Sequence, residues 1–466
     1  MTEILNNFFN TCNAFLFGPI MLVVFVGTGV FLTIRLGGVQ FSKFGFAMRE
    51  VFGKLFKKSD DTDTGTGQIK SFSALATALS SCIGVGNIAG VASAIALGGP
   101  GAIFWMWISA IFGMATKYSE ISLAMQFREQ DNLGNYRGGV MYILSKGMKH
   151  KKLGKFLGGC FALFVVFVSF ISCNAVQANS IAETLRVSFP NIKPYIWGVI
   201  LVILAALVIF GGIRKISSVT TYLTPIMACL YVLFGIIILC INASAIPNAF
   251  KLIFVSAFKG DAIVGGIAGA TMREAMKRGV SRGIFSNEAG IGSSALVHST
   301  AKVDVPNRQA LYGIAEVFVD TIIVCTFTAL IVLTSPSWNS GETGVALSNL
   351  AWKGALGLFG DVVLTISVIL FAFSTILGWS WYGETATTFL FGTKAIPVFR
   401  VIFLGCTFMG AVASVDVLWN AADFCNGLMS LPNLLSLWLF SGMVVKASRD
   451  FFARSEFNHL PNRGGK

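Results

Sequence analysis

Long apolar runs separated by short polar segments dominate the chain. The windows 195–213, 219–250 and 321–341 contain no charged residue. A helix of about 18 residues or more is long enough to cross the hydrocarbon core of a bilayer. The pattern therefore predicts an all-α polytopic membrane protein. We expect about eleven transmembrane helices, at residues 16–34, 72–98, 101–125, 157–183, 195–213, 219–242, 263–301, 309–335, 358–390, 398–414 and 417–445.

Composition supports this class. Of the 466 residues, 55% are hydrophobic and only 12% are charged, with a mean hydropathy of +0.73. Soluble domains carry about 25% charged residues. The nine cysteines lie mostly inside apolar runs and show no CxxC spacing, so we interpret them as packing residues rather than as metal ligands or disulfides. Residues 1–15 lack a basic region and a cleavage site, and no removable signal peptide is expected.

We interpret the net charge of +13 as a sign of membrane topology rather than of nucleic-acid binding. Lysine and arginine gather at the ends of apolar runs and in the segments 35–70, 117–156 and 446–466. Positively charged loops stay in the cytoplasm. We therefore expect the N-terminus outside and the C-terminus inside a plasma membrane, most simply a bacterial inner membrane. Residues 271–283 place four cations on the outer side. An amphipathic surface helix or a vestibule lining is favoured there over a misplaced span.

A short internal repeat suggests two related halves. Residues 84–93, GVGNIAGVAS, and 290–299, GIGSSALVHS, are identical at five of ten positions. Ser80 falls on Ser286 at the same offset. Five spans separate the copies, so the second copy runs through the membrane in the opposite direction. The predicted organisation is an extra N-terminal helix and basic loop (1–70), a first five-helix repeat (71–242), a second, inverted repeat (243–446) and a basic tail (447–466).

Glycine and asparagine in the middle of two spans predict broken helices. Unwinding frees backbone N–H and C=O groups at mid-membrane, where they must line a cavity or bind something. The N-terminus of a half-helix attracts a carboxylate, and freed carbonyls can replace the water shell of a small cation. Tight packing between glycine-bearing helices is the alternative. Two such breaks at matching positions favour the central site of a secondary transporter, suited to an amino acid plus Na⁺.

Several segments resemble one known family. They are GVGNIAGVA (84–92), GGPGAIFWMWISAIFG (98–113), YRGGVMYIL (136–144), RGIFSNEAGIGSSA (282–295) and FAFSTILGWSWYGE (371–384). All are similar to signature segments of the alanine or glycine:cation symporters, the sodium:alanine symporter family, and the resemblance covers residues 15–450. Trp381 departs from the tyrosine expected there. The resemblance implies the LeuT fold with its five-plus-five inverted repeat and two broken helices. It also implies uptake of small neutral amino acids with Na⁺, or with H⁺ in some members.

The resemblance also implies roles for the first break. Gly84 and Gly86 would offer N–H groups to the substrate carboxylate. Cys82 and Asn87 would lie at a first sodium site, and Asn87 would also border the substrate. A second sodium site would combine the carbonyls of Ser80 and Ile83 with Phe371, Ser374 and Thr375, and Thr375 would also border the substrate. Hydroxyls such as Ser374 and Thr375 also bond to their own helix, but we favour cation coordination.

The second break contains Asn287, Glu288 and Gly290, which we assign to the substrate site. The Asn287 side-chain oxygen is a candidate for binding the substrate ammonium. An acid at membrane depth is a functional candidate by default. Three roles remain open for Glu288: binding the ammonium, pairing with a cation, or capping the following half-helix.

Four further residues complete the candidates. Asp320 is a second buried acid, expected near the first sodium site. Gln177 either reaches the substrate or forms a hydrogen bond between helices. Trp379, one turn after Thr375, would wall the pocket and keep it small. For His298 a structural role is favoured over a proton relay.

Other classes of protein fit less well. The chain contains no HExxH, GxSxG, DDxxD or P-loop motif, so we expect neither an enzyme nor an ATP-driven pump. The antiparallel repeat favours alternating access over an ion channel. The prediction is a symporter for alanine and glycine, with Na⁺ as the coupling ion, no organic cofactor, and lipid but no nucleic acid as a partner. Proton coupling on the same fold is the alternative.

Overall fold

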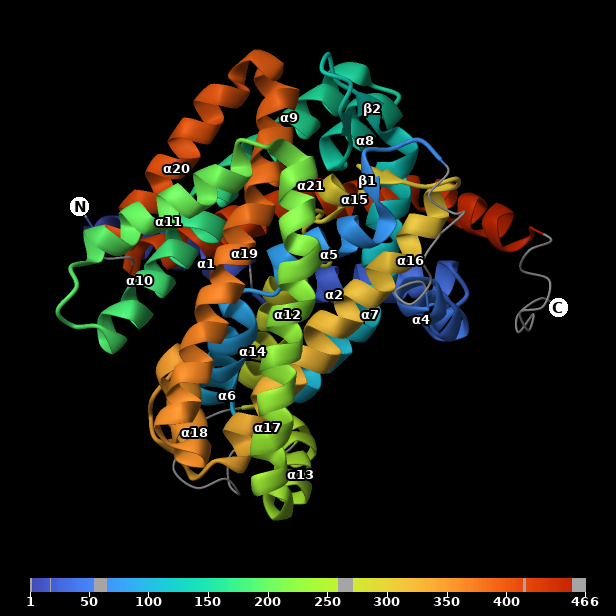
Figure 1. Ribbon diagram of the computed structural model, residues 1–466. Coiled ribbons are helices and arrows are strands. Elements are labelled where there is room, and N and C mark those ends of the chain that lie inside the picture. The colour runs from blue at the N-terminus through green and yellow to red at the C-terminus, as the bar shows by residue number, and fades with distance from the viewer. Residues whose placement is uncertain (1, 17, 54–64, 259–270, 414–415, 455–466) are drawn as a thin grey trace.

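The computed structural model is almost entirely helical (Figure 1). It describes residues 2–16, 18–53, 65–258, 271–413 and 416–454. In this part of the chain seven helices are long and apolar enough to cross a membrane, and one bent pair of helices would make an eighth. The other three predicted spans correspond to the helices Gly101–Phe127, Pro194–Ile209 and Met272–Asn287. The prediction of a helical, multi-span membrane protein is confirmed.

The α-helices have the following bounds: α1 Thr2–Leu16, α2 Pro19–Arg35, α3 Val39–Ser42, α4 Phe44–Phe52, α5 Ser71–Cys82, α6 Val91–Gly98, α7 Gly101–Phe127, α8 Val140–Gly147, α9 Lys151–Phe170, α10 Val176–Ser188, α11 Pro194–Ile209, α12 Gly212–Ile241, α13 Ile246–Phe258, α14 Met272–Asn287, α15 Ala295–His298, α16 Pro306–Val317, α17 Thr326–Thr334, α18 Gly344–Leu356, α19 Leu358–Phe391, α20 Ile396–Val412 and α21 Asp416–Phe452. Short 3₁₀ turns are η4 Ala243–Ala245, η6 Pro336–Asn339 and η7 Thr393–Ala395. The strands are β1 Ile69–Lys70, β2 Glu129–Gln130, β3 Tyr136–Arg137 and β4 Ala301–Lys302.

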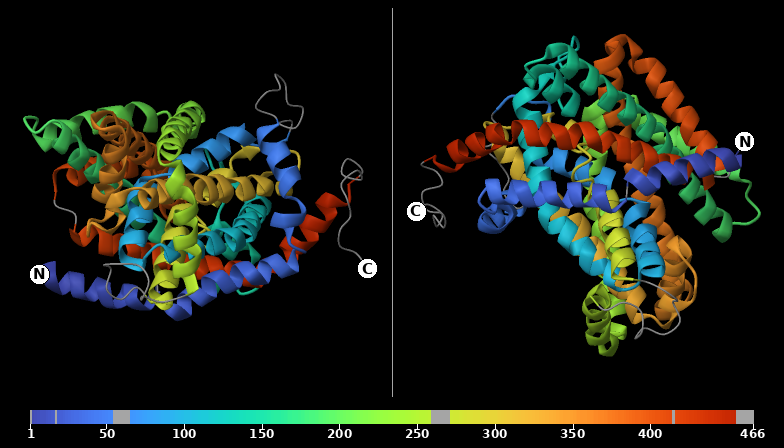
Figure 2. Two further views of the ribbon diagram at one scale, coloured as in Figure 1. Left: turned by 90° about the horizontal axis from the view of Figure 1, so that it is seen from below. Right: turned by 180° about the vertical axis from the view of Figure 1, so that it is seen from behind.

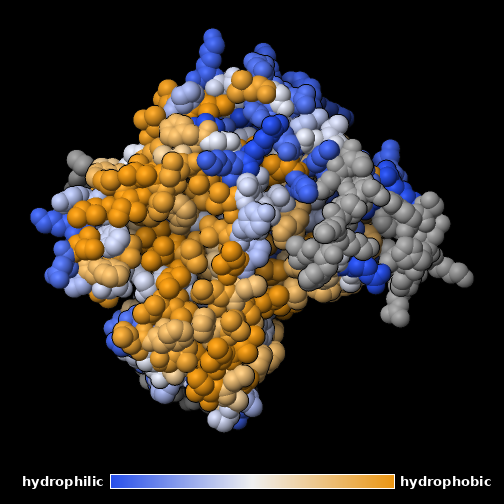
Figure 3. All heavy atoms as spheres, viewed as in Figure 1, coloured by the Kyte–Doolittle hydropathy of each residue, from blue (hydrophilic) through white to orange (hydrophobic). Residues whose placement is uncertain are grey.

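The outer surface is suited to lipid. Apolar side chains cover much of the face seen in Figure 3, over α11, α12, α19 and α20, and hydrophilic residues gather above it around α8 and β2. Leu207, Leu233 and Val401 expose more than half of their surface. A continuous apolar face of this kind marks a membrane contact rather than a water-facing surface. On the opposite side α1 and α2 lie along α21 (Figure 2).

The first predicted break lies where the glycines stand. Helix α5 ends at Cys82, and the chain turns by 54° before it continues to Gly98. Gly84 lies in the turn, and Gly86 opens the π-helical segment η2, Gly86–Gly90. Glycine and asparagine are poor helix formers, so breaking the helix here costs little free energy.

The second break follows α14. Glu288 adopts the left-handed conformation at φ 57°, and it is the only residue other than glycine with positive φ in the described part of the chain. Gly290 and Gly292 follow with φ of 92° and 84°. Left-handed backbone ends a helix and favours glycine. The helix resumes only as the four residues of α15.

Three π-helical segments fall at buried polar residues. They are η2, η3 (Ile171–Ala175) and η5 (Phe318–Cys325), and they contain Asn87, Asn174 and Asp320. All three side chains are fully buried. π-Bulges inside α-helices occur frequently at functional sites because they displace the register of the side chains.

Two details of the seventh span differ from the prediction. The helix begins at Met272, not at 263, and residues 259–270 lie outside the described part of the chain. Residues 271–283 do not form a separate surface helix: they are the first turns of α14, which packs on α7 through Gly279 and Gly283. Of the alternatives for this segment, the structure shows the misplaced start of the span, and Arg282 also lines a large cavity. Helices α1, α13 and α18 were not predicted.

A two-stranded parallel sheet joins the two broken spans at one end. Strand β1 precedes the first break, β4 follows the second, and Ile69 and Lys70 pair with Ala301 and Lys302. Arg128, just after α7, donates to the carbonyls of Ser299 (2.9 Å), Ala301 (2.7 Å) and Thr66 (2.7 Å). The guanidinium therefore clamps both segments together on the side predicted to be cytoplasmic.

Another arginine on the same side, Arg137, is fully buried. Arg137 pairs with Glu384 at 3.1 Å and with Asp131 at 2.6 Å, and its guanidinium lies 4.6 Å from the centroid of the Trp381 ring. Burial opposes ionisation of Asp131, but hydrogen bonds from Arg137 and from the N–H groups of Asn135 and Leu133 hold its pKa below the usual range. Trp381 thus packs on Arg137 rather than contacting lipid, and this explains a tryptophan at that position.

Candidate functional site

A small cavity lies between the two breaks. It has a volume of about 20 Å³, enough for about one water molecule. Six predicted site residues line it, namely Cys82, Gly84, Gly86, Gln177, Glu288 and Thr375. The other lining residues are Ser81, Ser172, Cys173, Phe285, Ile291 and Asn426. Small and polar side chains predominate, so the wall suits a small molecule that carries its own polar groups, and the cavity has to widen to admit one.

The unwound backbone of the first break is partly held by side chains. The Gly84 N–H donates to Asn87 Oδ1 at 3.0 Å, and the Val85 N–H reaches Gln177 Oε1 at 3.5 Å. Gln177 therefore hydrogen-bonds to the break and also lines the cavity. The Phe285 ring lies directly on Gly86, where an added Cβ would come within 3.0 Å of it.

Gly84→Ala is expected to weaken alanine binding about tenfold or more. A Cβ at Gly84 would lie 2.7 Å from Thr375 Oγ1, so α5 and α19 would have to separate. Overpacking of this kind costs about 1–3 kcal/mol, and 1.4 kcal/mol is tenfold in affinity. Binding of labelled alanine to the purified protein measures the effect. Gly405→Ala is the matched control, because a Cβ there meets nothing within 4 Å, and equal affinities for the two variants would contradict the prediction.

Oxygen atoms converge beside the first break. Asn87 Nδ2 donates to Asp320 Oδ1 at 2.7 Å and to Ser286 Oγ at 2.9 Å. The hydroxyls of Ser286 and Thr321 both donate to Asp320 Oδ2 at 2.7 Å. A carboxylate and two hydroxyls are oxygen ligands suited to a hard cation, whereas the Asn87 amide presents its nitrogen to them and keeps its oxygen on the Gly84 N–H. The structure thus brings Asn87 and Asp320 together, as expected.

Ser286 and Thr321 were missed by the sequence analysis. Ser286 had a signal, because it aligns with Ser80 in the internal repeat. Cys82 was placed at this site, but its thiol points elsewhere and donates to Glu316 at 3.3 Å. Only the carbonyl of Cys82 remains a candidate ligand.

The residues of the second predicted ion site also meet. Ser374 Oγ and Thr375 Oγ1 lie 3.1 Å and 3.2 Å from the Ser80 carbonyl oxygen. Both hydroxyls also bond to the carbonyl of Phe371, at 2.9 Å and 3.0 Å. The structure therefore contains both the helix back-bonding and the convergence on α5. Ile83 is fully buried and follows α5 directly.

Glu288 faces the cavity from the second break. Its carboxylate accepts hydrogen bonds from Trp379 Nε1 at 3.2 Å and from the Ser293 hydroxyl. No lysine or arginine bonds to it within the described residues. Trp379 is not among the lining residues, so it supports Glu288 rather than walling the cavity directly.

Asn287 and Gly290 build the break and do not line the cavity. Asn287 Oδ1 accepts from the Ala289 N–H at 2.9 Å, and its Nδ2 donates to Thr321 Oγ1 at 3.1 Å. The Gly290 N–H donates to Glu120 Oε1 at 2.8 Å. The Asn287 oxygen predicted to meet an ammonium group is thus occupied by the backbone.

A much larger cavity, with a volume of about 770 Å³, adjoins the small one. The two share Gly86 and Phe285. Arg282 lies over the Phe285 ring, 5.6 Å from its centroid, and 3.9 Å from Asp423 of α21. Phe285 and the Arg282–Asp423 pair therefore stand between the small cavity and the larger one. The sequence analysis did not identify Phe285 or Asp423.

Two broken spans around a buried polar cavity, within a multi-span helical bundle, define a secondary transporter. The chain belongs to the sodium:alanine symporter family, which it matches over residues 2–463, and it is therefore a transporter and not an enzyme. It is 45% identical over 446 residues to the sodium/alanine symporter AgcS of Methanococcus maripaludis, which spans 95% of this chain and 96% of that protein. It is 33% identical over 453 residues to the probable sodium/glutamine symporter GlnT of Bacillus subtilis, with 97% and 91% covered.

The fold also resembles a solved structure. The crystal structure of MhsT in complex with L-phenylalanine matches with a TM-score of 0.60 at 14% identity, over 84% of this chain and 94% of that one. The predicted LeuT-type fold is confirmed by this likeness.

Proposed function

We propose that this protein imports small neutral amino acids, alanine and glycine, together with Na⁺ by alternating access. The observation that carries the proposal is the meeting of two helix breaks around one small polar cavity, with two oxygen clusters directly beside it. Membership of the family and the similarity to a sodium/alanine symporter support the same substrate and ion.

The cavity suggests how the substrate lies. At the Gly86 end of the first break the backbone is unwound, and its N–H groups suit a carboxylate. The Glu288 carboxylate faces the cavity, and no cation is bonded to it among the described residues. We therefore assign it to the substrate ammonium rather than to a helix cap. Phe285 and Thr375 then border the side chain, and the close walls at Gly84 and Gly86 leave room only for small residues.

Two sodium ions would occupy the oxygen clusters. The first would be held by Asp320, Ser286, Thr321 and Asn87, whose amide oxygen must then leave the Gly84 N–H. The second would be held by Ser374, Thr375 and the carbonyls of Ser80, Phe371 and Ile83. Filling the first site therefore frees the Gly84 N–H for the substrate, which would link the binding of ion and amino acid.

The larger cavity would be the outer vestibule of a plasma-membrane protein whose N-terminus is outside and whose C-terminus is cytoplasmic. In that orientation Phe285 and the Arg282–Asp423 pair close over the substrate. The sheet of β1 and β4 closes the cytoplasmic side.

Uptake of labelled alanine into liposomes tests the proposal. The purified protein is given an inward Na⁺ gradient or an inward H⁺ gradient, and accumulation is expected with Na⁺ alone. Gly84→Ala liposomes are the matched control and should accumulate far less. Accumulation with H⁺ alone would replace Na⁺ by the proton-coupled alternative. A flux that does not saturate with alanine would indicate a channel and contradict alternating access.

A further inference from the structure

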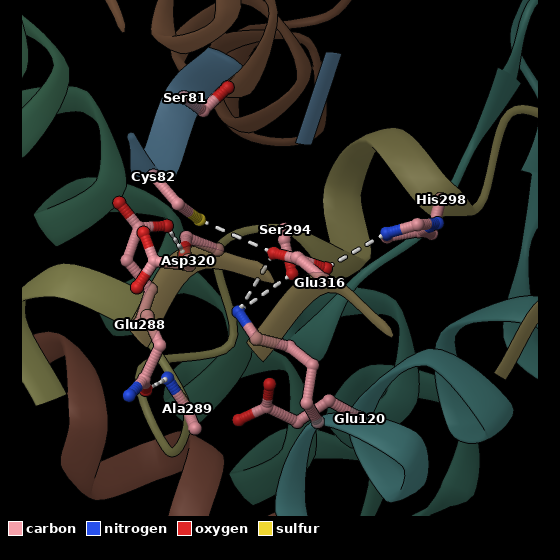
Figure 4. A network of polar contacts seen from close by, with 12 residues as sticks. Ser81, Cys82, Glu120, Glu288, Ala289, Ser294, His298, Glu316 and Asp320 are labelled. Atoms are coloured by element: carbon pink, nitrogen blue, oxygen red, sulfur yellow. Dashed lines mark hydrogen bonds and ion pairs between the residues drawn. The ribbon is translucent and has the colours of Figure 1, made fainter. Parts of the chain in front are cut away.

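A buried ion pair lies between the two breaks. Lys117 of α7 and Glu316 of α16 are fully buried, and Lys117 Nζ lies 3.3 Å from Glu316 Oε1. Figure 4 shows the Glu316 carboxylate between Cys82 and His298, with Asp320 and Glu288 on the other side of Cys82. Neither Lys117 nor Glu316 lines the cavity.

The pair is bonded to both broken spans. Lys117 Nζ donates to Ser294 Oγ at 2.9 Å, and Ser294 directly precedes α15 after the second break. The Cys82 thiol donates to Glu316 Oε1 at 3.3 Å, and Cys82 is the last residue of α5 before the first break. One ion pair therefore connects the two places at which the chain unwinds.

His298 lies against the second oxygen of Glu316. Its Nε2 lies 3.0 Å from Glu316 Oε2, and its Nδ1 lies 2.8 Å from Gln309 Nε2. Gln309 Nε2 also donates to the Ser71 carbonyl, so it is the amide nitrogen and Nδ1 must accept. The proton of a neutral His298 is then on Nε2, pointing at Glu316. Lys117 is left as the cation that compensates Glu316 among the described residues.

Stability alone does not account for this arrangement. A protein with a buried ion pair is often no more stable than one with apolar residues of the same volume in its place. The best-attested role of such a pair is to fix one arrangement of the chain. We propose that Lys117 and Glu316 are positioning residues, which fasten the two breaks to each other and thereby set the affinity of the site for Na⁺. The inference rests on the proposed function, because it concerns the ion site beside Cys82.

The experiment is a Na⁺ titration of labelled-alanine binding to the purified full-length protein. Glu316→Gln keeps the shape of the side chain and removes its charge. The Na⁺ concentration for half-maximal binding is expected to rise about tenfold. Losing a residue that orients the ligands of an ion typically weakens ion binding by about 10–100-fold, and we expect the lower end of this range. Alanine affinity at saturating Na⁺ should change much less, because the pair does not touch the cavity. A purely structural role would lower thermal stability without this difference between ion and substrate.

Two further variants test the inference in case Glu316→Gln does not fold. Lys117→Met with Glu316→Gln removes both charges of the pair, so neither partner is left without the other, and it should fold and still require more Na⁺. Ser294→Ala detaches Lys117 from the second break and leaves the ion pair intact. It should shift the Na⁺ requirement in the same direction.

The matched control is Arg137→Met with Glu384→Gln, another buried ion pair, whose members also bond to Asp131 and Arg400 and contact neither break. Its Na⁺ requirement should stay at the wild-type value. Unchanged Na⁺ requirements in Ser294→Ala and in the folded Glu316 variants would overturn the inference, as would equal shifts for Na⁺ and alanine. Wild-type protein that binds alanine without Na⁺ would instead overturn the proposed function.

Discussion

Asn87→Ala should reduce Na⁺-driven alanine uptake about 100-fold at low Na⁺. Asn87 bonds both to the first break, at the Gly84 N–H, and to the Asp320 carboxylate. Its removal leaves Asp320 with fewer donors and takes away one oxygen of the proposed ion site. A hydrogen bond to a charged group contributes about 1.5–3 kcal/mol, and two such losses correspond to roughly 100-fold or more. Uptake into liposomes over a range of Na⁺ concentrations measures the change.

The matched control for this prediction is Asn174→Ala. Asn174 is also a fully buried asparagine in a π-helical segment, with bonds to the Phe403 carbonyl at 2.6 Å and to the Thr407 hydroxyl at 2.7 Å. It belongs to neither oxygen cluster. We expect lower thermal stability and an unchanged Na⁺ requirement for this variant. If Asn87→Ala transported with the wild-type Na⁺ response, the first ion site would have to lie elsewhere.

The two breaks were predictable because their cause is local. Glycine and asparagine lower helix propensity wherever they stand, and hydropathy gives the spans on both sides. Gly84 and Gly86 follow from the same reasoning, whereas Cys82 and Thr375 were assigned through the family resemblance; all four line the cavity. The fold class followed from the length and number of the apolar runs.

The orientation of the second break was not predictable in the same way. Asn287, Glu288 and Gly290 are neighbours in the sequence, yet only Glu288 faces the cavity. Which side chain turns inward depends on the left-handed conformation at Glu288 and on the Glu120 carboxylate that binds the Gly290 N–H. Neither is visible in a short window of sequence.

Lys117 shows most clearly what could not be predicted from the sequence. The predicted span 101–125 already contains Lys117, yet we counted its charge with the basic segment 117–156; α7 runs to Phe127 and buries Lys117 completely. A charge inside a span is tolerated only when a partner is present. That partner, Glu316, is on α16, far away in the sequence, and periodicity carries no information about contacts at such a separation. Lys117 was therefore counted as a loop cation rather than as half of a buried pair.

Joining strands β1 and β4 covalently should stop transport completely. Lys70 and Lys302 are paired across the sheet and both are exposed. Neighbouring strands lie about 4.8 Å apart, within the Cα separations that disulfides span. Opening towards the side predicted to be cytoplasmic has to separate the start of one broken span from the end of the other. In Lys70→Cys with Lys302→Cys, oxidation should reduce Na⁺-driven uptake to background, and a reductant should restore it.

Alanine binding distinguishes a locked transporter from a damaged one. The sheet lies away from both cavities, so the oxidised double variant should still bind alanine in a Na⁺-dependent manner while it fails to transport. Gln130→Cys with Tyr136→Cys is the matched control, because it joins β2 to β3 within one hairpin and ties no broken span to another. Its uptake should not respond to oxidation. Full transport by the oxidised Lys70 and Lys302 variant would mean that the two broken spans move together, and the cytoplasmic path would then have to open between other helices.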